Sequence, residues 1–273
     1  MEPDMKYPDS PPSYEDTLQT DSKRLNLPPA TLVLEDKSIR DESEPSTHLY
    51  QLSRTVTTLP RTPPKNSSVI FERLEHAPNV LVKPETSKSI PEPRCRHLFY
   101  LAHPADAQYR TDIPGYYMTS VDAAETVGNI HLETSKSRLQ KTEFTALLSV
   151  KRTASHKPLF DEGGKLVTLF KARATGLMNS RYIWTDGSGH QVAFEVKEDE
   201  KYKLAITTPM SQASRDALVG LWVLKLWYET AESKDAKRDA LERMMPLTLH
   251  QDMRLARKTG ALGALGALGG AGC

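Results

Sequence analysis

The stretch ALVGLWVL at residues 217–224 is apolar at every position, and after Lys225 the apolar character resumes as LWY. Ser211 and Ser214 precede it, and serine is a residue type that caps helix N-termini. A helix that is hydrophobic on all sides is normally enclosed by protein on all sides. The stretch is far shorter than the roughly 20 residues that a bilayer-spanning helix needs. We therefore expect a helix that is buried inside the rest of the fold.

The residues after this stretch indicate where the helix ends. Residues 229–245 carry many charges, so we expect this half of the helix to be solvated. Pro246 cannot continue a helix, which predicts a helix over about residues 211–245. The remaining residues, 246–273, end in the Gly/Ala/Leu repeat GALGALGALGGAGC, whose glycine content favours disorder.

Upstream of the helix, short runs rich in Val, Ile, Leu, Tyr and Phe alternate with turn formers, which is typical of antiparallel strands. In the run VAFEV, the apolar side chains of Val192, Phe194 and Val196 are expected to share one face. The segment DGSG at residues 186–189 has the composition of a hairpin turn. The predicted strands are Ala30–Leu34, His48–Arg54, Ser68–Leu74, His97–His103, Tyr116–Val121, Val127–Glu133, Glu143–Val150, Lys165–Ala172, Arg181–Thr185, Gln191–Val196 and Tyr202–Thr208.

A series of antiparallel strands followed by a wholly apolar helix has a simple solution, in which the sheet closes on itself and the helix fills the lumen. We therefore predict a mainly β protein, a closed antiparallel barrel of about eleven or twelve strands around a C-terminal hydrophobic helix. The barrel domain is expected to span residues 30–245. Residues 1–29 and 246–273 are expected to be disordered tails.

Residues 1–29 are rich in proline and charge, so they cannot bury enough surface to offset their ordering entropy. Pro11, Pro12 and Tyr14 in this tail form a PPxY motif. Prolines favour polyproline II geometry, which WW domains bind in an aromatic groove at little entropic cost. We therefore expect a WW-domain partner, such as a HECT-type ubiquitin ligase or its adaptor. The alternative interpretation is a chance tetrapeptide in a proline-rich tail.

The overall composition argues against several other classes of protein. The formal net charge is +1, so no global field favours nucleic acid, and we expect no nucleic-acid partner. Two isolated cysteines, Cys95 and Cys273, favour a reducing compartment. The N-terminus MEPDMKYPDS lacks the apolar segment of a secretory signal. These features together predict a cytoplasmic protein.

Motifs of catalysis and metal binding are missing from the sequence. It contains no G-x-S-x-G, Walker A or G-x-G-x-x-G pattern, and its eight histidines do not show metal-ligand spacing. We therefore predict no catalytic residues, no metal, no cofactor and a non-enzymatic role. The segment PRTPPK at residues 60–65 fits the form that SH3 domains bind, although a proline cluster in a loop is the preferred interpretation.

The order of the runs resembles the tubby C-terminal-like superfamily, which includes LURP-one-related proteins and phospholipid scramblases. Thr31–Leu34 with Ile39, and Leu49–Leu52, are similar to the opening hairpin of that barrel. Gly128–Leu132 is similar to a middle strand, and Ala217–Trp227 to the central helix. Over residues 30–245 the chain resembles a fungal branch of this superfamily, which implies a barrel around a helix.

This resemblance also implies a second hypothesis for function, because tubby proteins bind phosphoinositides and scramblases associate with membranes. The sequence lacks the cysteine cluster and the calcium-binding segment of scramblases. Our first hypothesis is an interaction protein whose barrel is a scaffold for the PPxY tail. The alternative is a module that binds anionic lipid at the membrane periphery, if basic side chains converge on one barrel face. The candidates are Lys136, Arg138, Lys141, Lys151 and Arg152, for which solvated loops are the simpler interpretation.

Overall fold

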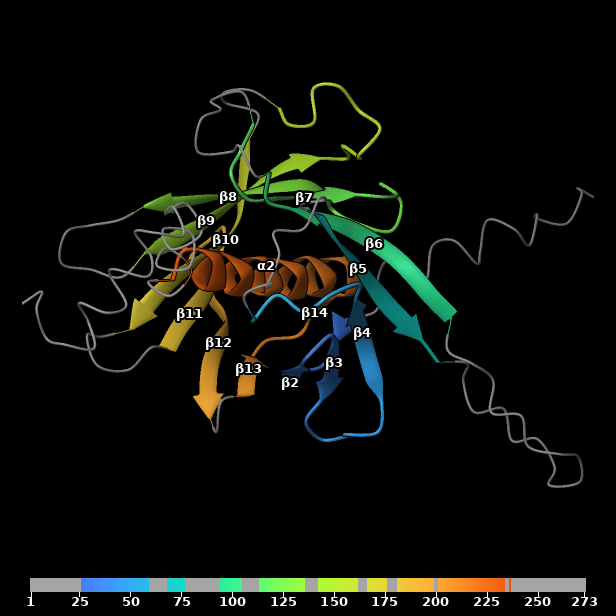
Figure 1. Cartoon of the computed structure of the whole chain (residues 1–273), viewed down its shortest axis with the longest axis vertical. Coiled ribbons are helices and arrows are strands. Elements are labelled where there is room, and N and C mark those ends of the chain that lie inside the picture. Colours follow the sequence, from blue (N-terminus) through green and yellow to red (C-terminus); the bar gives the residue numbers. More distant parts are fainter. Residues whose placement is uncertain are drawn as a thin grey trace, which may run out of the picture.

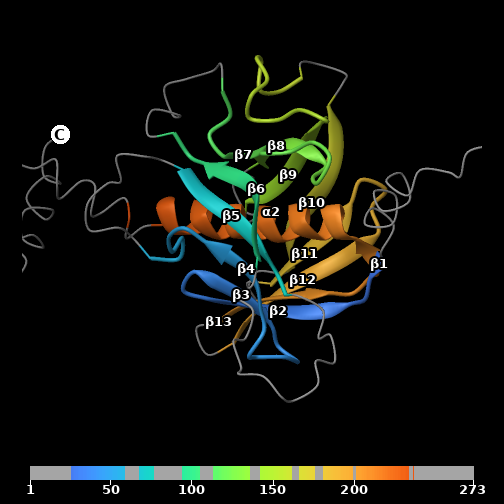
Figure 2. The same cartoon turned by 90° about the vertical axis from the view of Figure 1, so that its right-hand side faces the viewer.

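The barrel and its helix are described by a computed structural model of the chain. It covers residues 26–58, 68–76, 94–104, 113–135, 142–161, 166–175, 181–198, 201–233 and 236. Among these residues, twelve strands form one closed antiparallel barrel, and the helix α2 runs through its interior (Figure 1). The view turned by 90° shows the same ring of strands around α2 (Figure 2). The predicted fold class is therefore confirmed.

Every barrel strand pairs with its neighbours in the chain, and β13 pairs with β2 to close the ring. At this closure Leu204 lies opposite Leu32, and both side chains are fully buried. A closed ring leaves no strand edge unpaired. The barrel strands are β2 (Ala30–Glu35), β3 (Ser38–Asp41), β4 (His48–Leu52), β5 (Ser68–Glu75), β6 (Arg94–Ala102), β7 (Tyr117–Ser120), β8 (Gly128–Ser135), β9 (Glu143–Val150), β10 (Val167–Thr175), β11 (Arg181–Asp186), β12 (Gln191–Glu198) and β13 (Lys201–Ile206).

The helix α2 spans Gln212–Ala231, and its side chains are buried without interruption from Arg215 to Tyr228. Ser211 is its N-cap, because the Ser211 hydroxyl accepts a hydrogen bond from the backbone N–H of Ser214. The apolar stretch thus lies where the sequence predicts it. The helix ends at Ala231, earlier than the predicted limit, and most of the predicted continuation to residue 245 lies outside the described residues.

Three short strands are absent from the sequence-based prediction. Asn26–Leu27, which the composition places in the tail, forms β1 and pairs with β14 at Met210–Ser211. The strand β3 has the sequence SIRD, in which only Ile39 is buried. Such short, polar segments carry no period that a sequence pattern can detect. Residues 1–25 and 246–273 lie outside the described residues.

The apolar residues of β12 do not all lie on its buried face. Val192 is buried, but Phe194 and Val196 are only half-buried, whereas Ala193 and Glu195 point into the core. The cause is an irregularity in the pairing of β11 with β12, where the register shifts between Trp184 and Thr185. A bulge inverts the alternation of all residues that follow it. This inversion directs the carboxylate of Glu195 toward α2.

The barrel has two mouths, which we name by the course of α2. The start mouth lies where β13 ends and α2 begins, and the end mouth lies where α2 finishes. Because neighbouring strands are antiparallel, β9 begins at the end mouth with Glu143 and finishes at the start mouth with Val150. The eight residues of β9 span about 25 Å along the strand from one mouth to the other.

Candidate functional site

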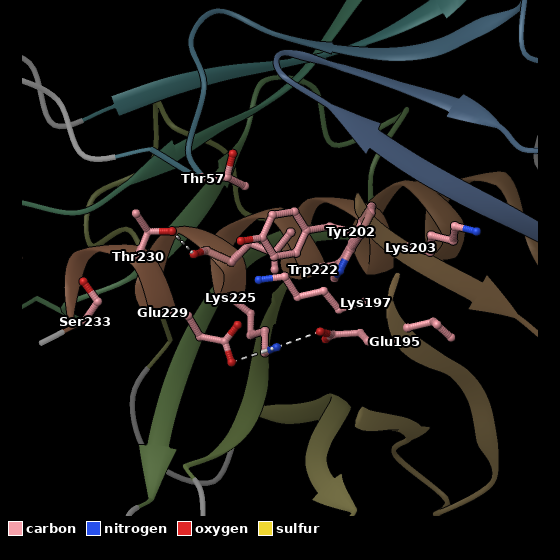
Figure 3. A pocket seen from close by; sticks show the side chains of 12 residues that line it. Thr57, Glu195, Lys197, Tyr202, Lys203, Trp222, Lys225, Glu229, Thr230 and Ser233 are labelled. Atoms are coloured by element: carbon pink, nitrogen blue, oxygen red, sulfur yellow. Dashed lines mark hydrogen bonds and ion pairs between the residues drawn. The ribbon is translucent and has the colours of Figure 1, made fainter. Parts of the chain in front are cut away.

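A pocket of about 550 Å³ opens at the end mouth, between the last turns of α2 and the strands β12 and β13. We call it the end-mouth pocket. Its lining includes Glu195, Lys197 and Tyr202 from the strands and Trp222, Lys225 and Glu229 from the helix (Figure 3). Volumes of this size are typical of sites for small molecules.

Lys225 is the charged residue that interrupts the apolar stretch, and it is 1% exposed. Its Nζ donates to Glu195 Oε2 at 2.7 Å and lies 2.9 Å from Glu229 Oε1, one turn further along the helix. The same ammonium lies 3.6 Å from the centroid of the Tyr182 ring. A buried cation is tolerated only when it is paired and hydrogen-bonded, and Lys225 meets both conditions.

Glu195 is buried, and both of its carboxylate oxygens have partners. Trp184 Nε1 donates to Oε1 at 2.9 Å, and Lys225 occupies Oε2. Burial raises the pKa of Glu195 above its ordinary value, while the charge of Lys225 opposes that rise. Burial likewise raises the pKa of the nearby Tyr182 phenol. The chain Trp184–Glu195–Lys225–Glu229 is therefore internally satisfied and crosses from the barrel wall to the helix. Figure 3 shows its Glu195, Lys225 and Glu229 members.

Other polar groups of the end-mouth pocket are not satisfied. Trp222 is fully buried, and its Nε1 has no hydrogen-bond partner among the described residues. Lys197 is exposed, and its Nζ lies 5.0 Å from the centroid of the Tyr202 ring. Figure 3 shows Lys197 below the Tyr202 ring, with the Lys225 ion pairs just beneath Lys197 in the view. Trp222 Nε1 has no accessible surface, so Lys197 is the donor of this group that is open to solvent.

A second buried charge cluster lies near the first turn of α2. Asp216 is fully buried and its carboxylate contacts the guanidinium of Arg73. Tyr50 Oη donates to Asp216 Oδ1 at 2.8 Å, and Gln212 Nε2 donates to the same oxygen at 2.6 Å. Three donors on one carboxylate stabilise its ionised form, although burial raises its pKa above the ordinary value. This cluster joins α2 to β4 and β5.

Asp186, Ser188 and His190 lie together in the hairpin turn between β11 and β12, and their hydrogen bonds are internal to that turn. Asp186 Oδ1 accepts hydrogen bonds from the Ser188 hydroxyl at 2.6 Å and from the His190 backbone N–H at 2.9 Å. The Ser188 hydroxyl also lies 2.8 Å from His190 Nδ1. The Ser188 hydroxyl and the Asp186 carboxylate thus lie near the same ring nitrogen of His190. In a catalytic triad the serine and the acid contact different nitrogens of the histidine ring. We interpret these bonds as the closure of the predicted hairpin.

The predicted WW-binding residues Pro11, Pro12 and Tyr14 lie outside the described residues. The described chain does locate the point from which the tail departs. The strand β1 pairs with β14 directly before α2, and Arg215 Nη1 donates to the carbonyl oxygen of Pro28 at 3.4 Å. The N-terminal tail therefore joins the barrel at the start mouth.

Two of the five predicted basic residues, Lys151 and Arg152, lie in the described part of the chain. Lys136, Arg138 and Lys141 lie outside the described residues, but Ser135 and Glu143 on either side of them belong to the end mouth. Lys151 and Arg152 follow Val150 at the start mouth. Arg152 is also engaged in its own loop, because its Nε lies 2.7 Å from Asp161 Oδ1 and its Nη1 donates to the Pro158 carbonyl. The described residues therefore do not show the five basic side chains on one face of the barrel.

Within the described part of the chain, no cluster of three or more His, Cys, Asp or Glu side chains has the arrangement of a metal site. Cys95 lies exposed on β6 as a free thiol. Among the same residues, no helix combines the length and the apolar character that a membrane crossing requires.

Comparisons of the chain with protein-family models, with curated proteins and with solved structures found no match. The structure itself defines the class, which is a closed twelve-stranded antiparallel barrel with a central helix. Its most distinctive site is the end-mouth pocket. The sequence offered one signal for this site, since Lys225 is a single charge within an apolar stretch. Glu195 gave no comparable signal, because its inward direction depends on the bulge between β11 and β12.

Proposed function

We propose that this protein is a non-enzymatic interaction protein, in which the barrel is a scaffold and the N-terminal tail recruits a WW-domain partner. The observation that carries the proposal is the PPxY motif of Pro11, Pro12 and Tyr14. The two prolines favour the extended geometry that WW domains bind, and the tyrosine fills a neighbouring pocket of the domain. A HECT-type ubiquitin ligase or its adaptor is the partner class that fits this motif.

The position of the barrel anchor supports this arrangement. Tyr14 precedes Asn26, the first residue of β1, by twelve residues. A linker of this length spans at most about 40 Å when it is fully extended. A WW domain bound to the tail would therefore be held within that distance of the start mouth, whatever conformation the linker adopts.

The filled interior of the barrel supports a scaffold role. The side chains of α2 are buried from Arg215 to Tyr228, so the helix itself occupies the centre of the barrel. A twelve-stranded barrel around a single apolar helix is also the arrangement that the tubby-like resemblance implies. We include membership of that superfamily in the proposal, together with a cytoplasmic location.

The test is a pull-down of the full chain by an isolated WW domain. We expect the wild-type protein to be retained and Tyr14→Ala to be lost, because the alanine removes the side chain that fills the tyrosine pocket. Tyr7→Ala is a matched control in the same tail and should be retained like wild type. Equal retention of Tyr14→Ala and wild type would exclude the proposal.

The lipid-binding alternative makes a different prediction. No described contact favours it, and of its five basic residues only Lys151 and Arg152 lie in the described part of the chain. Flotation with phosphoinositide-containing vesicles at low salt, where electrostatic attraction is strongest, measures the binding of the protein to lipid directly. Binding that is lost in Lys136→Gln/Arg138→Gln/Lys141→Gln but kept in Lys151→Gln would establish a lipid surface at the end mouth. Absence of flotation at low salt would exclude this alternative.

A further inference from the structure

A second pocket, of about 560 Å³, opens at the start mouth, and we call it the start-mouth pocket. It lies between the first residues of β10, the turn from β11 to β12 and the connection from β13 to β14. Leu169, Pro209 and Met210 line it, and all three are half-buried or exposed, so their carbon is accessible to a ligand. Such a lining suits the apolar part of a ligand.

The turn from β11 to β12 adds a hydrogen-bond acceptor to this lining. Asp186 accepts two hydrogen bonds from Ser188 and one from the His190 backbone N–H, all through Oδ1. Its Oδ2 lies 3.8 Å from His190 Nδ1, beyond hydrogen-bond distance, and the Asp186 side chain is 35% exposed. Apolar walls with one free acceptor fit a side chain that has an apolar body and a hydroxyl at its tip, which is the chemistry of tyrosine.

The N-terminal tail leaves the barrel beside this pocket. In the pairing of β1 with β14, Leu27 lies opposite Met210, which lines the pocket. Asn26 lies opposite Ser211, whose hydroxyl accepts a hydrogen bond from the backbone of Ser214, and Ser214 also lines the pocket. The chain that precedes Asn26 therefore starts next to the pocket.

The length of the tail places Tyr14 within reach of the pocket. Twelve residues separate Tyr14 from Asn26, and a random coil of this length has an r.m.s. span of about 20 Å. A side chain on such a linker has an effective concentration on the order of 1 mM at a site that the linker spans. An intrinsic Kd of about 0.1 mM would therefore keep the side chain bound about nine-tenths of the time.

The tail, residues 1–25, contains two tyrosines, Tyr7 and Tyr14. Tyr14 is closer to the anchor at β1, and Pro11 and Pro12 precede it. Prolines restrict the chain to an extended conformation, so less entropy is lost when this segment docks. The segment of residues 11–14 is therefore the part of the tail that best fits the start-mouth pocket.

We propose that the start-mouth pocket binds Tyr14 of the same chain, and that this contact competes with the WW-domain partner. The Tyr14 hydroxyl donates to Asp186 Oδ2, and its ring packs against Met210. This inference rests on the proposed function, since the tyrosine concerned is the one that the WW domain recognises. Because Tyr14 cannot occupy both pockets at once, the partner must first displace the tail from the barrel.

The first measurement detects the docked tail without any partner. It uses the full chain labelled with ¹³C at the methionine methyl groups, in which the Met210 resonance is identified by its loss in Met210→Leu. We expect Tyr14→Ala to shift this resonance, because the aromatic ring beside Met210 is removed. Tyr7→Ala, in the same tail, should leave it in place. An unmoved Met210 resonance in Tyr14→Ala, or an equal shift in Tyr7→Ala, would overturn the proposal.

The second measurement is the Kd of an isolated WW domain for the full chain. Thr208 is half-buried and lines the pocket, so the indole of Thr208→Trp should occupy the site of Tyr14. Thr207→Trp is the matched control, because Thr207 is exposed and is not part of the lining. We expect Thr208→Trp to lower the Kd about tenfold, as release of a tail that is docked about nine-tenths of the time predicts. Thr207→Trp should bind like wild type.

The outcomes separate this proposal from the proposed function. Equal Kd values for Thr208→Trp and wild type would overturn the competition between barrel and partner. Absence of WW binding by wild type and both variants would instead refute recruitment through the tail. The Met210 resonance would then decide by itself whether Tyr14 docks on the barrel.

Discussion

At the scale of single residues, Asp216 is an acidic residue of α2 whose side chain lies inside the barrel. Its carboxylate is fully buried and is paired with Arg73, whose side chain is 14% exposed. Removing the Asp216 carboxylate would leave Arg73 only its partly exposed partners Glu75 and Glu125, and the loss of a buried partner from an ion pair is strongly destabilising. The Asp216 carboxylate is therefore expected to contribute more to the free energy of unfolding than an exposed carboxylate does.

We expect Asp216→Asn to lower the free energy of unfolding by about 3 kcal/mol. Glu125→Gln is the matched control, since Glu125 pairs with Arg73 and Arg96 but is 37% exposed. Exposed ion pairs contribute about 0–1 kcal/mol, so this control should change little. Urea denaturation of the three proteins measures both differences. Equal losses for the two variants would contradict a structural role for the buried pair.

Gly128 at the start of β8 is held in a conformation that other residues rarely adopt, with φ at 129°. A Cβ at this position would lie 2.4 Å from the backbone oxygen of Ser149. We expect Gly128→Ala to destabilise the fold by about 3 kcal/mol, because backbone strain and a steric clash add together. Gly189→Ala separates the two causes, since Gly189 also has a positive φ, of 90°, but open space around its Cβ position. It should cost only about 1 kcal/mol in the same denaturation experiment.

At the scale of elements, the sequence predicted α2 well because its signal is local. An uninterrupted apolar stretch and a serine cap lie within about twenty residues. Most barrel strands were predicted for the same reason. The partners of the buried charges could not be predicted, since Arg73 and Asp216 are 143 residues apart in the chain. Glu195 also depends on a bulge, which has no sequence signature in this hairpin.

The ion pair between Glu195 of β12 and Lys225 of α2 should affect how the free energy of unfolding depends on pH. Burial raises the folded-state pKa of Glu195, so the folded chain holds this proton more tightly than the unfolded chain. The contribution of Glu195 to the free energy of unfolding is therefore fully present below pH 4.5 and declines as the pH rises through the folded pKa.

We expect the difference in unfolding free energy between wild type and Glu195→Gln to decrease above this pH. The decrease is at most about 1.4 kcal/mol per pH unit. Urea denaturation of both proteins across the range from about pH 4 to pH 7 measures it, and taking the difference removes the effects of other carboxylates. A difference that grows with pH would show that Lys225 outweighs burial at this carboxyl.

At the scale of the whole molecule, the barrel is closed by a pairing between its first and last strands, and α2 is enclosed by all of them. Two buried ion pairs hold the helix, one near its first turn at Asp216 and one further along at Lys225. The same closure places the tail anchor at one mouth and the end-mouth pocket at the other. The tail anchor and the end-mouth pocket therefore lie at opposite ends of a single scaffold.

The enclosure of α2 is the claim on which these proposals rest, and native-state hydrogen exchange tests it most directly. An enclosed helix exchanges its amide protons only when the barrel opens, so the protection of Ala217–Leu224 should equal the global free energy of unfolding. The exposed turn at residues 186–190 should exchange far faster and serves as the internal reference. Exchange of Ala217–Leu224 at rates close to those of the turn would show that the helix lies outside the barrel.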